Sequence, residues 1–241
     1  MANPWFRFKQ FTVHHDRCAM KVTTDACLFG AWVASKMANN SATSNVLDIG
    51  TGTGLLSLML AQQLPGSSID AIELDAGAAA QAEANVQQSP FATQIQVIPQ
   101  DVLRFEATYR YDLIISNPPF HERQLASPHG HKNKAHHDAS LTLNDLARAC
   151  SKMLSPNGQV ALLLPYYRKD EALKLLQEHG LHPAIVCYVK QSAAHSFFRT
   201  MILTGTAPVP QVKQEIIAIK NEDQEYTPEF VTLLKDYYLI F

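Results

Sequence analysis

The sequence predicts an α/β fold with a mostly parallel, seven-stranded sheet and an antiparallel strand at its edge. Strand-like apolar runs alternate with helix-like segments over residues 45–179, which is typical of parallel strands joined by right-handed crossovers. The last two strand-like runs, 184–190 and 196–205, are close together in the sequence, which favours an antiparallel hairpin. The chain is 46% hydrophobic and 17% charged, which is enough apolar material for a packed core.

The first half of the chain carries the regular part of this alternation. "NVLDI" is a short apolar run typical of a buried strand, and the helical segment after it ends at Pro65-Gly66. An Ala-rich segment with helical composition separates the next two strands. The predicted strands of this half are 45–49, 68–74, 94–101 and 111–116, and its predicted helices are 25–37, 54–64 and 76–88.

The second half continues with longer strands. Pro156-Asn157-Gly158 predicts a turn between a helix and the apolar run "QVALLLP", and Gly180 separates a helix from the strand that follows it. The predicted helices are 141–154 and 168–179, and the predicted strands are 159–165, 184–190 and 196–205.

The length of the chain suggests one domain, and its net charge shows no overall excess of basic residues. The 241 residues suit a single domain with an N-terminal segment (1–40), a core (41–205) and a C-terminal extension (206–241). The net charge of −2 excludes a general electrostatic attraction to nucleic acid. Charge is uneven, however: residues 1–36 hold five basic and two acidic side chains, a net of +3.

The cysteines and the apolar runs indicate an intracellular setting. Cys18, Cys27, Cys150 and Cys187 lack CxxC or metal-finger spacing, so we expect buried reduced thiols. The N-terminal residues lack the apolar region of a signal peptide, and no run approaches the roughly 18 apolar residues of a membrane helix. We therefore expect a cytoplasmic protein that makes no membrane contact.

A glycine-rich turn, "LDIGTGTG" (47–54), joins the first core strand to the following helix. Gly50, Gly52 and Gly54 permit a tight turn and a close approach of a ligand to the backbone. The spacing differs from the G-x-G-x-x-G of pyrophosphate-binding dehydrogenases. Asp48 stands two residues before the first glycine, where a carboxylate suits a cationic ligand such as an ammonium group. A structural turn without ligand remains the alternative.

Two more acids fall at the ends of the next strands. Glu73 lies about 20 residues beyond the glycines, where a carboxylate can accept hydrogen bonds from ribose hydroxyls, and Asp75 is a competitor for that role. Asp101 ends the third strand and could accept a hydrogen bond from an adenine amino group. Each acid alone could equally be a solvated or capping residue.

The order of these features resembles the class I S-adenosylmethionine-dependent methyltransferases, which have a Rossmann-like fold. An acid with a glycine-rich turn, two strand-end acids and "NPPF" (117–120) follow four successive strands, and open α/β sheets bind ligands at such ends. The resemblance runs from about residue 21 to residue 205. It implies that Asp48, Gly50 and Gly52 hold the methionine end of S-adenosyl-L-methionine, with Glu73 at its ribose and Asp101 at its adenine.

The Asn-Pro-Pro-Phe elbow suits the methylation of an amino group. The Asn117 side-chain oxygen and the Pro118 carbonyl can accept hydrogen bonds from an NH₂ group and stabilise charge that develops on its nitrogen. Pro118 and Pro119 stiffen the backbone and offer no competing N–H. Phe120 offers a face on which an extruded base could stack. A rigid turn is the structural alternative.

Both ends of the chain resemble the bacterial tRNA1(Val) adenine N6-methyltransferase family. The resemblance implies methylation of the adenosine just 3′ of the anticodon and places Lys21, Thr24 and Asp25 over the cofactor. Thr23 stands where that family often has a small residue, and Thr24 could also be the N-cap of the 25–37 helix. The tail "YTPEFVTLLKDYYL" (226–239) also resembles that family. The N-terminal matches are Gln10, Phe11, Val13, Met20 to Val22, Thr24, Asp25, Leu28 and Gly30 to Trp32.

Other acceptors and a non-catalytic role stay open at this point. Similar elbows serve guanine N2 in ribosomal RNA and the side-chain amide of release-factor glutamine. Enzymes of the release-factor kind usually carry a separate N-terminal helical domain, for which the 44 residues before the first core strand leave no room. A cofactor-binding RNA scaffold without activity is the second alternative, and the presence of Asn117 argues against it.

A polar segment at 122–138 is the remaining feature. Its histidines could bind zinc, but no cysteine or helical spacing supports a metal site, and we expect none. A mobile loop that orders against RNA phosphates fits better, with the valine tRNA anticodon stem-loop as the expected partner and no obligatory protein partner. The side chains concerned are His121, Arg123, His129, His131, Lys132, Lys134, His136 and His137.

Overall fold

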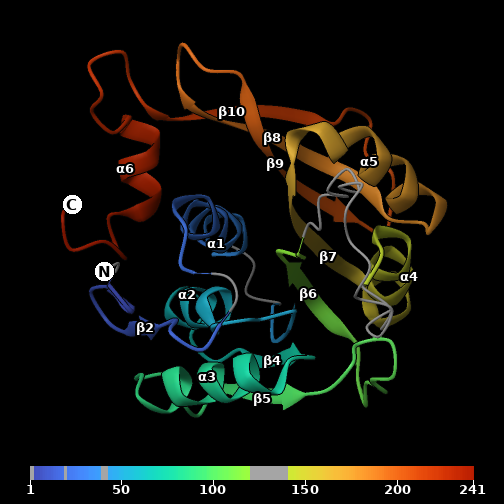
Figure 1. The fold of residues 1–241 in the computed structure, drawn as a ribbon. Coiled ribbons are helices and arrows are strands. Elements are labelled where there is room, and N and C mark those ends of the chain that lie inside the picture. The colour runs from blue at the N-terminus through green and yellow to red at the C-terminus, as the bar shows by residue number, and fades with distance from the viewer. Residues whose placement is uncertain (1–2, 19–20, 39–42, 120–140) are drawn as a thin grey trace, which may run out of the picture.

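The computed structural model describes residues 3–18, 21–38, 43–119 and 141–241. It has three layers, with helices on both faces of a twisted central sheet (Figure 1). The expected α/β fold with a mostly parallel sheet is confirmed. Alternate residues of the core strands enter the two hydrophobic cores, as Val46 and Leu47 do, because successive side chains of a strand point to opposite faces.

The main sheet has eight strands in the order β10-β8-β9-β7-β6-β3-β4-β5. The chain moves outward from β3 through β4 to β5 on one side and through β6 to β7 on the other. This reversal next to β3 is the topological switch point at which open α/β sheets bind ligands. The strands are β3 (Asn45–Ile49), β4 (Ser68–Glu73), β5 (Ile95–Pro99), β6 (Tyr111–Ser116), β7 (Leu154–Pro165), β8 (His182–Ser192), β9 (Phe197–Gly205) and β10 (Lys213–Lys220).

The sheet differs from the expected one at its far side. The hairpin of β8 and β9 is antiparallel as expected, but β9 inserts between β7 and β8 and so lies inside the sheet. An eighth strand, β10, pairs in parallel with β8 and forms the outer edge. The expectation of seven strands with an antiparallel edge was therefore wrong in these two details.

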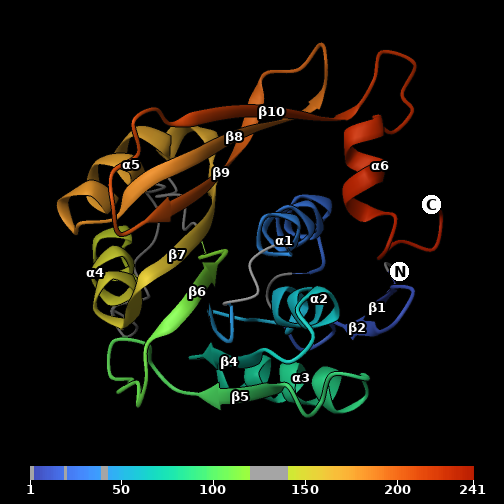
Figure 2. The ribbon, with the colours of Figure 1, turned by 180° about the vertical axis from the view of Figure 1, so that it is seen from behind.

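The helices cover the two faces unequally. One face carries α1 (Thr24–Met37), α2 (Leu55–Gln63), α3 (Ala76–Gln87) and α6 (Pro228–Leu234), and the other carries α4 (Leu143–Met153) and α5 (Lys169–Glu178) (Figures 1 and 2). A 3₁₀ turn, η1 (Tyr166–Arg168), leads from β7 into α5. Ten of the 14 residues of α1 and seven of the 9 residues of α2 are buried, because both helices are apolar around most of their circumference.

The predicted turn at Pro156-Asn157-Gly158 is present as an irregularity within β7. The register with β6 jumps from Tyr111↔Leu154 to Leu113↔Gln159, so the intervening residues bulge out of the ladder. A Cβ on Gly158 would lie 2.8 Å from the Tyr111 carbonyl oxygen. Only glycine allows the backbone to approach so closely at this point.

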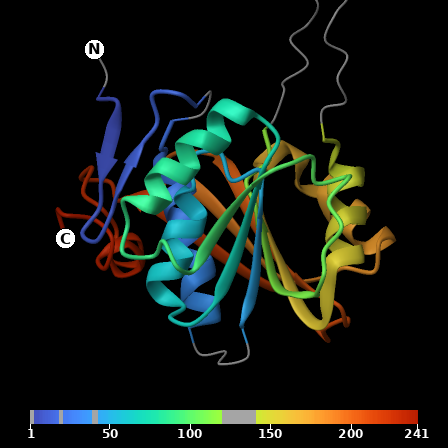
Figure 3. The same cartoon turned by 90° about the horizontal axis from the view of Figure 1, so that it is seen from below.

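The N-terminal and C-terminal segments pack together at one end of the molecule (Figure 3). A small hairpin of β1 (Trp5–Arg7) and β2 (Thr12–His14) lies against the residues after α6. The Lys9 amide donates a hydrogen bond of 2.8 Å to the Tyr237 carbonyl, and the Phe6 and Tyr238 rings are 5.5 Å apart. This packing brings the β1–β2 hairpin into contact with the residues that follow α6.

Helix α1 starts at Thr24, so Thr23 is its N-cap and Thr24 is not. The Thr23 side chain makes no capping hydrogen bond, and its φ of −122° is an ordinary extended value. Threonine therefore replaces the small residue of the family pattern without backbone strain.

None of the four cysteines forms a disulfide, and burial raises the pKa of the Cys27, Cys150 and Cys187 thiols to about 12, so they stay protonated. Among the described residues, no helix is long and apolar enough to span a membrane. The same residues contain no group of three or more side chains that could bind a metal, and the 121–137 histidines lie outside them.

Candidate active site

The parallel strands β3, β4, β5, β6 and β7 end at one edge of the sheet, here called the carboxyl edge. The glycine-rich turn after β3 lies at its centre. The Gly50 and Thr51 amides donate hydrogen bonds of 2.9 and 3.0 Å to the Ile72 carbonyl on β4. Gly50 and Gly52 have φ values of +70° and +57°, and a Cβ on either would meet nothing within 4 Å. The turn therefore needs glycine for its conformation and leaves open space above its backbone.

Asp48 is fully buried beneath this turn. Its Oδ2 accepts hydrogen bonds of 2.6 Å from the Thr51 hydroxyl and 2.7 Å from the Ser57 hydroxyl. Its Oδ1 is buried and has no hydrogen-bond partner among the described residues. Burial raises the pKa of Asp48 to about 6, against the opposing effect of the two hydroxyl bonds, and the nearby Glu73 charge raises it further. A cation placed at Oδ1 would satisfy both the unpaired oxygen and the buried charge.

Glu73 ends β4 and connects the turn to the next loop. Its Oε2 accepts a hydrogen bond of 2.9 Å from the Gly52 amide, and its Oε1 accepts one of 2.9 Å from the Asp75 amide. A carboxylate has about four acceptor positions, so two remain for a ligand. The competitor Asp75 is the N-cap of α3 and accepts a 2.8 Å bond from the Ala78 amide. This capping bond gives Asp75 a structural role, and Glu73 stays the better candidate for ribose.

Asp101 follows β5 at the same edge. Its Oδ1 accepts a hydrogen bond of 2.9 Å from the Leu103 amide, and its Oδ2 lies 3.9 Å from Arg104 Nε. The Gln100 amide donates a 3.0 Å bond to the Glu73 carbonyl, which places the two acid-bearing loops side by side. The adenine role of Asp101 stays a prediction, and its turn-forming bond shows that it also organises its own loop.

Asn117 and the first proline of the elbow follow β6, next to the glycine-rich turn. The Ser116 hydroxyl donates a buried hydrogen bond of 2.7 Å to the Ile49 carbonyl, which ties the end of β6 to the end of β3. Asn117 is half-buried, Pro118 is buried and Pro119 is exposed. Phe120 lies outside the described residues, so its stacking role stays a prediction.

The start of α1 reaches the carboxyl edge from the side. Lys21 and Thr24 are exposed there, whereas Asp25 forms an ion pair with Arg199, with 2.6 Å between Asp25 Oδ2 and Arg199 Nε. Arg199 pairs in register with Pro165, the last residue of β7. The ion pair therefore fixes α1 against the edge of β7 and β9.

Asn85 of α3 holds the N-terminal segment at His14 close to the glycine-rich turn. Its side chain exchanges two hydrogen bonds of 2.9 Å with the His14 backbone and donates another of 2.9 Å to the Thr53 carbonyl. Cys18 follows this anchor, and its pKa is raised to about 11 by burial and by the charges of Glu73 and Asp75. That coupling puts Cys18 within the electrostatic reach of the two acids.

Several side chains that organise this site were missed from the sequence. Thr51 and Ser57 stand three and nine residues after Asp48, and the short spacing of hydroxyls after a buried acid was an available signal. Leu74 is 68% exposed beside Glu73, so an apolar surface lies next to that acid. Arg199 and Asn85 act over long sequence separations, for which a single sequence holds no signal.

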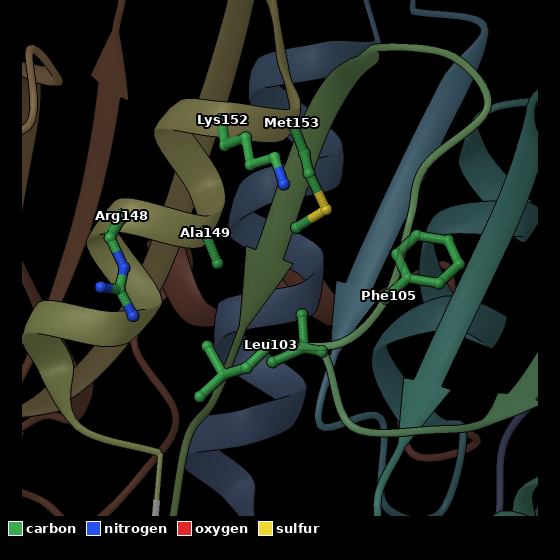
Figure 4. Close-up of a pocket in the computed structure, with 7 residues that line it drawn as sticks. Leu103, Phe105, Arg148, Ala149, Lys152 and Met153 are labelled. Carbon is green, nitrogen blue, oxygen red and sulfur yellow. The ribbon is translucent and has the colours of Figure 1, made fainter.

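A cavity of about 300 Å³ lies elsewhere, between the segment after β5 and helix α4 (Figure 4). Leu103 and Phe105 face Arg148, Lys152 and Met153 there. These α4 residues belong to its last turns, near the start of β6, so on this side the cavity extends away from the carboxyl edge.

Comparison with known proteins decides the family. The methyltransferase small domain model matches residues 30–179. A tRNA1(Val) (adenine(37)-N6)-methyltransferase of Parabacteroides distasonis is 39% identical, with 99% of both chains covered. The protein of the same name from Dyadobacter fermentans is 41% identical, again with 99% of both chains covered. The chain belongs to this methyltransferase family. The resemblance found in the sequence is thereby confirmed.

Solved structures agree on the fold. A predicted O-methyltransferase from Agrobacterium tumefaciens superposes with a TM-score of 0.67 at 15% identity, covering 88% of this chain and 96% of the other. At that identity the likeness concerns the fold alone, which is the Rossmann-like class I methyltransferase fold.

The residues present fit the cofactor of this family, S-adenosylmethionine. The unpaired Asp48 Oδ1 suits its ammonium group, and the open space over Gly50 and Gly52 leaves room for a ligand against the backbone. Glu73 keeps acceptor positions for ribose hydroxyls. The same chemistry would be wrong for a pyrophosphate, because Asp48 and Glu73 would repel it.

Proposed function

We propose that this protein transfers a methyl group from S-adenosylmethionine to N6 of adenosine 37 in tRNA1(Val). The observation that carries the proposal is the similarity to methyltransferases of that name at 39% and 41% identity over 99% of the chain. The Asn-Pro-Pro elbow beside the glycine-rich turn supports it, because acceptors for an amine then lie next to the methyl donor.

The cofactor side of the site would be held by the residues around β3 and β4. S-adenosylmethionine, when bound, supplies a methyl group on a cationic sulfur that is ready for transfer to a nitrogen. Asp48 Oδ1 would accept a hydrogen bond from its ammonium group, and Glu73 would accept bonds from the ribose hydroxyls. Asp101 would accept from the adenine amino group, with Leu74 against the ring.

The elbow would hold the target amine. The Asn117 side-chain oxygen and the Pro118 carbonyl would each accept one N–H of the adenine amino group, which orients its nitrogen toward the methyl group. As the bond from this nitrogen to the methyl carbon forms, the bond from that carbon to sulfur would break and leave a neutral thioether. Positive charge would thus pass from sulfur to nitrogen, where both acceptors would stabilise it. The methylated nitrogen then loses one proton to solvent and becomes neutral, so the chain needs no strong base.

The target base must leave the anticodon loop to reach these acceptors. Phe120 would provide a stacking face for the extruded adenine. Lys21 and Thr24, exposed at the start of α1, would cover the cofactor from the side, and the Asp25–Arg199 ion pair would keep that helix in place.

The test is methyl transfer with identification of the product. The protein is incubated with labelled S-adenosylmethionine and bulk tRNA from a strain that lacks the corresponding gene, and the modified nucleosides are separated. We expect label in N6-methyladenosine and in valine tRNA. A valine tRNA transcript with guanosine at position 37 is the matched control and should take no label. Label in N2-methylguanosine, in a protein substrate or in no product would overturn the proposal.

A further inference from the structure

Three aromatic rings gather where β7 ends beside the β8–β9 hairpin. The Phe197 ring centroid lies 5.3 Å from that of Tyr166 and 5.3 Å from that of Tyr188, and the Tyr166 and Tyr188 centroids are 5.8 Å apart. All three side chains are only partly buried, and the neighbouring Tyr167 is 68% exposed. These four residues are here called the aromatic cluster. A cluster that served only the core would be covered more fully.

Two lysines lie over these rings. Lys169 Nζ is 5.6 Å from the Tyr166 centroid and 5.7 Å from the Tyr188 centroid, and Lys190 Nζ is 5.5 Å from the Phe197 centroid. Lys169 also forms an ion pair of 3.2 Å with Asp170, which is largely exposed. Among the described residues no carboxylate lies within ion-pair distance of Lys190, whose ammonium group instead donates to the Ala193 carbonyl at 3.2 Å. Its charge therefore stays available to an anion.

The aromatic cluster lies at the carboxyl edge, on the same side of the sheet as α4 and α5. Tyr188 and Lys190 alternate with Val189, whose side chain enters the core on the α1 face, so both point to the opposite face. Ser116 at the end of β6 pairs with Leu162 of β7, and β9 and β8 follow next in the sheet. Three strand spacings of about 4.8 Å thus separate the elbow from Tyr188, a distance of about 15 Å.

We propose that the aromatic cluster with Lys169 and Lys190 is a docking surface for RNA nucleotides that flank the methylated adenosine. Unstacked bases bind to aromatic faces, and their phosphates bind to lysines, which is the pairing present here. A loop of a few nucleotides can span the distance to the elbow. This inference rests on the proposed function, since it assumes an RNA substrate at the elbow.

The proposal locates RNA contacts in a region that the sequence did not suggest. From the sequence, the polar 122–138 segment is the expected RNA contact, and residues 1–36 carry an excess of basic side chains. The aromatic cluster comes instead from the end of β7 and from the β8–β9 hairpin, which become neighbours because β9 pairs with β7. A protein partner could also use such a surface, but lysines over aromatic rings, with Lys190 outside any ion pair among the described residues, favour a polyanion with flat bases.

The test compares ring removal with ring retention at two positions. Phe197→Leu and Tyr188→Leu keep apolar volume and remove the stacking face, whereas Phe197→Tyr and Tyr188→Phe keep the ring. Lys190→Ala removes the available charge. Lys152→Ala is its matched control, because Lys152 is exposed on α4 near the start of β6, at the opposite edge of the sheet. Each variant is assayed for its KM for valine tRNA, kcat, the salt dependence of tRNA binding and the Kd for S-adenosylmethionine.

We expect the two leucine variants to raise KM for tRNA by about tenfold or more. The ring-retaining variants should keep the parental KM. Lys190→Ala should reduce the slope of log K against log salt by about one, and Lys152→Ala should leave it unchanged. The Kd for S-adenosylmethionine should stay at the parental value throughout, which shows that each variant is folded.

Two different failures can be told apart. If the parent protein does not methylate valine tRNA, the proposed function is wrong. If the parent does so but the leucine variants keep the parental KM and Lys190→Ala keeps the parental slope, the RNA docking surface is wrong while the proposed function stands. That second result would leave the aromatic cluster to a protein partner or to packing alone.

Discussion

The two halves of the carboxyl edge are built in different ways. Around β3 and β4, two acids accept hydrogen bonds from fixed donors: Glu73 from the Gly52 and Asp75 amides, and Asp48 from two hydroxyls. Around β7, β9 and β8, half-exposed rings and lysines meet through weaker cation–π contacts. The first half is thus defined by backbone geometry and the second by adaptable side chains.

This difference matches the ligands that the two halves are proposed to bind. A small cofactor has one shape, so a rigid turn that is already hydrogen-bonded loses little entropy when it binds. An RNA loop is large and flexible, and long side chains can adjust to it. Substitutions in the first half should therefore affect cofactor affinity sharply, and those in the second should affect RNA affinity by smaller, separate amounts.

The largest effect should come from the elbow that joins the two halves. Asn117→Ala should lower kcat by about 10²–10³, because it removes an acceptor that acts mainly as charge develops in the transition state. Cofactor and tRNA affinities should stay within a few-fold of the parent, since both ligands have other contacts. Single-turnover rates and equilibrium binding on one tRNA separate the two quantities. A near-parental rate would remove Asn117 from the chemistry.

Phe120→Ala is the natural comparison for that variant. Loss of a stacking face worth roughly 1–3 kcal/mol per base should weaken capture of the extruded adenine as well as turnover. The two variants would then differ in their effect on tRNA binding, and the same effect from both would deny Phe120 a separate role.

The next largest effect concerns cofactor binding by the half of the carboxyl edge around β3 and β4. Glu73→Ala should weaken S-adenosylmethionine binding by about 1.5–3 kcal/mol, because it removes bonds to ribose and also the acceptor of the Gly52 amide. Asp75→Ala is the control, and its loss of an N-cap should reduce stability by about 1 kcal/mol with little change in cofactor affinity. Calorimetry and thermal unfolding measure both. If Asp75→Ala gave the larger affinity loss, the ribose role would pass to Asp75.

A pH dependence should follow from the buried acid. The pKa of Asp48 is raised from 3.8 to about 6, so its charge destabilises the unliganded fold, and that cost appears as pH rises from about 4 through about 6. A cationic ligand at Oδ1 favours the charged form. Cofactor affinity should therefore rise with pH, by up to about tenfold per pH unit below 6, and level off above it.

Asp48→Asn is the control for this pH dependence. It removes the titrating group, so its weaker cofactor binding should lose the rise near pH 6. Calorimetry in buffers of different ionisation enthalpy should also show proton release at pH 5.5 for the parent alone. An affinity that is flat between pH 5 and 7 in the parent would show that Asp48 does not meet the cation.

The smallest effect concerns RNA binding by the polar segment 122–138. Replacing both Lys132 and Lys134 by Ala should reduce the salt slope of tRNA binding by up to about two phosphate contacts. The cofactor affinity should not change. An unaltered slope would show that this segment does not touch RNA, and the aromatic cluster would then be the stronger candidate for the RNA contact.

The residues of the carboxyl edge around β3, β4 and β6 could be predicted from the sequence because each is marked by a local pattern. Each of the core strands β3, β4 and β6 is an apolar run that ends at a glycine, an acid or a proline, and parallel pairing then brings these ends together. Asp48, Glu73 and Asn117 were found in this way, and the structure places them at one edge. Their roles toward the cofactor and the amine stay predictions.

The rest depends on contacts between distant residues. Strand β10 was missed because only Ile217 and Ile219 of it are buried, while Ile216 is 59% exposed, so its pattern is weak. The Asp25–Arg199 ion pair joins residues 174 positions apart, and the aromatic cluster depends on where β9 inserts. Sequence patterns report the period of one element and the pairing of strands that are close in the sequence, but not where a distant segment inserts.

The contact between the two terminal segments has a consequence for how the protein is made. Lys9 Nζ donates to the Lys235 carbonyl, across 226 positions of sequence. Contacts this distant must wait until almost the whole chain has left the ribosome, whereas β3 to β6 can pair much earlier. The hairpin that leads to Lys21 and α1 would thus settle last. In a newly made chain, the glycine-rich turn would form before Lys21 and Thr24 reach their places beside it. Full cofactor affinity would therefore appear only when folding is complete.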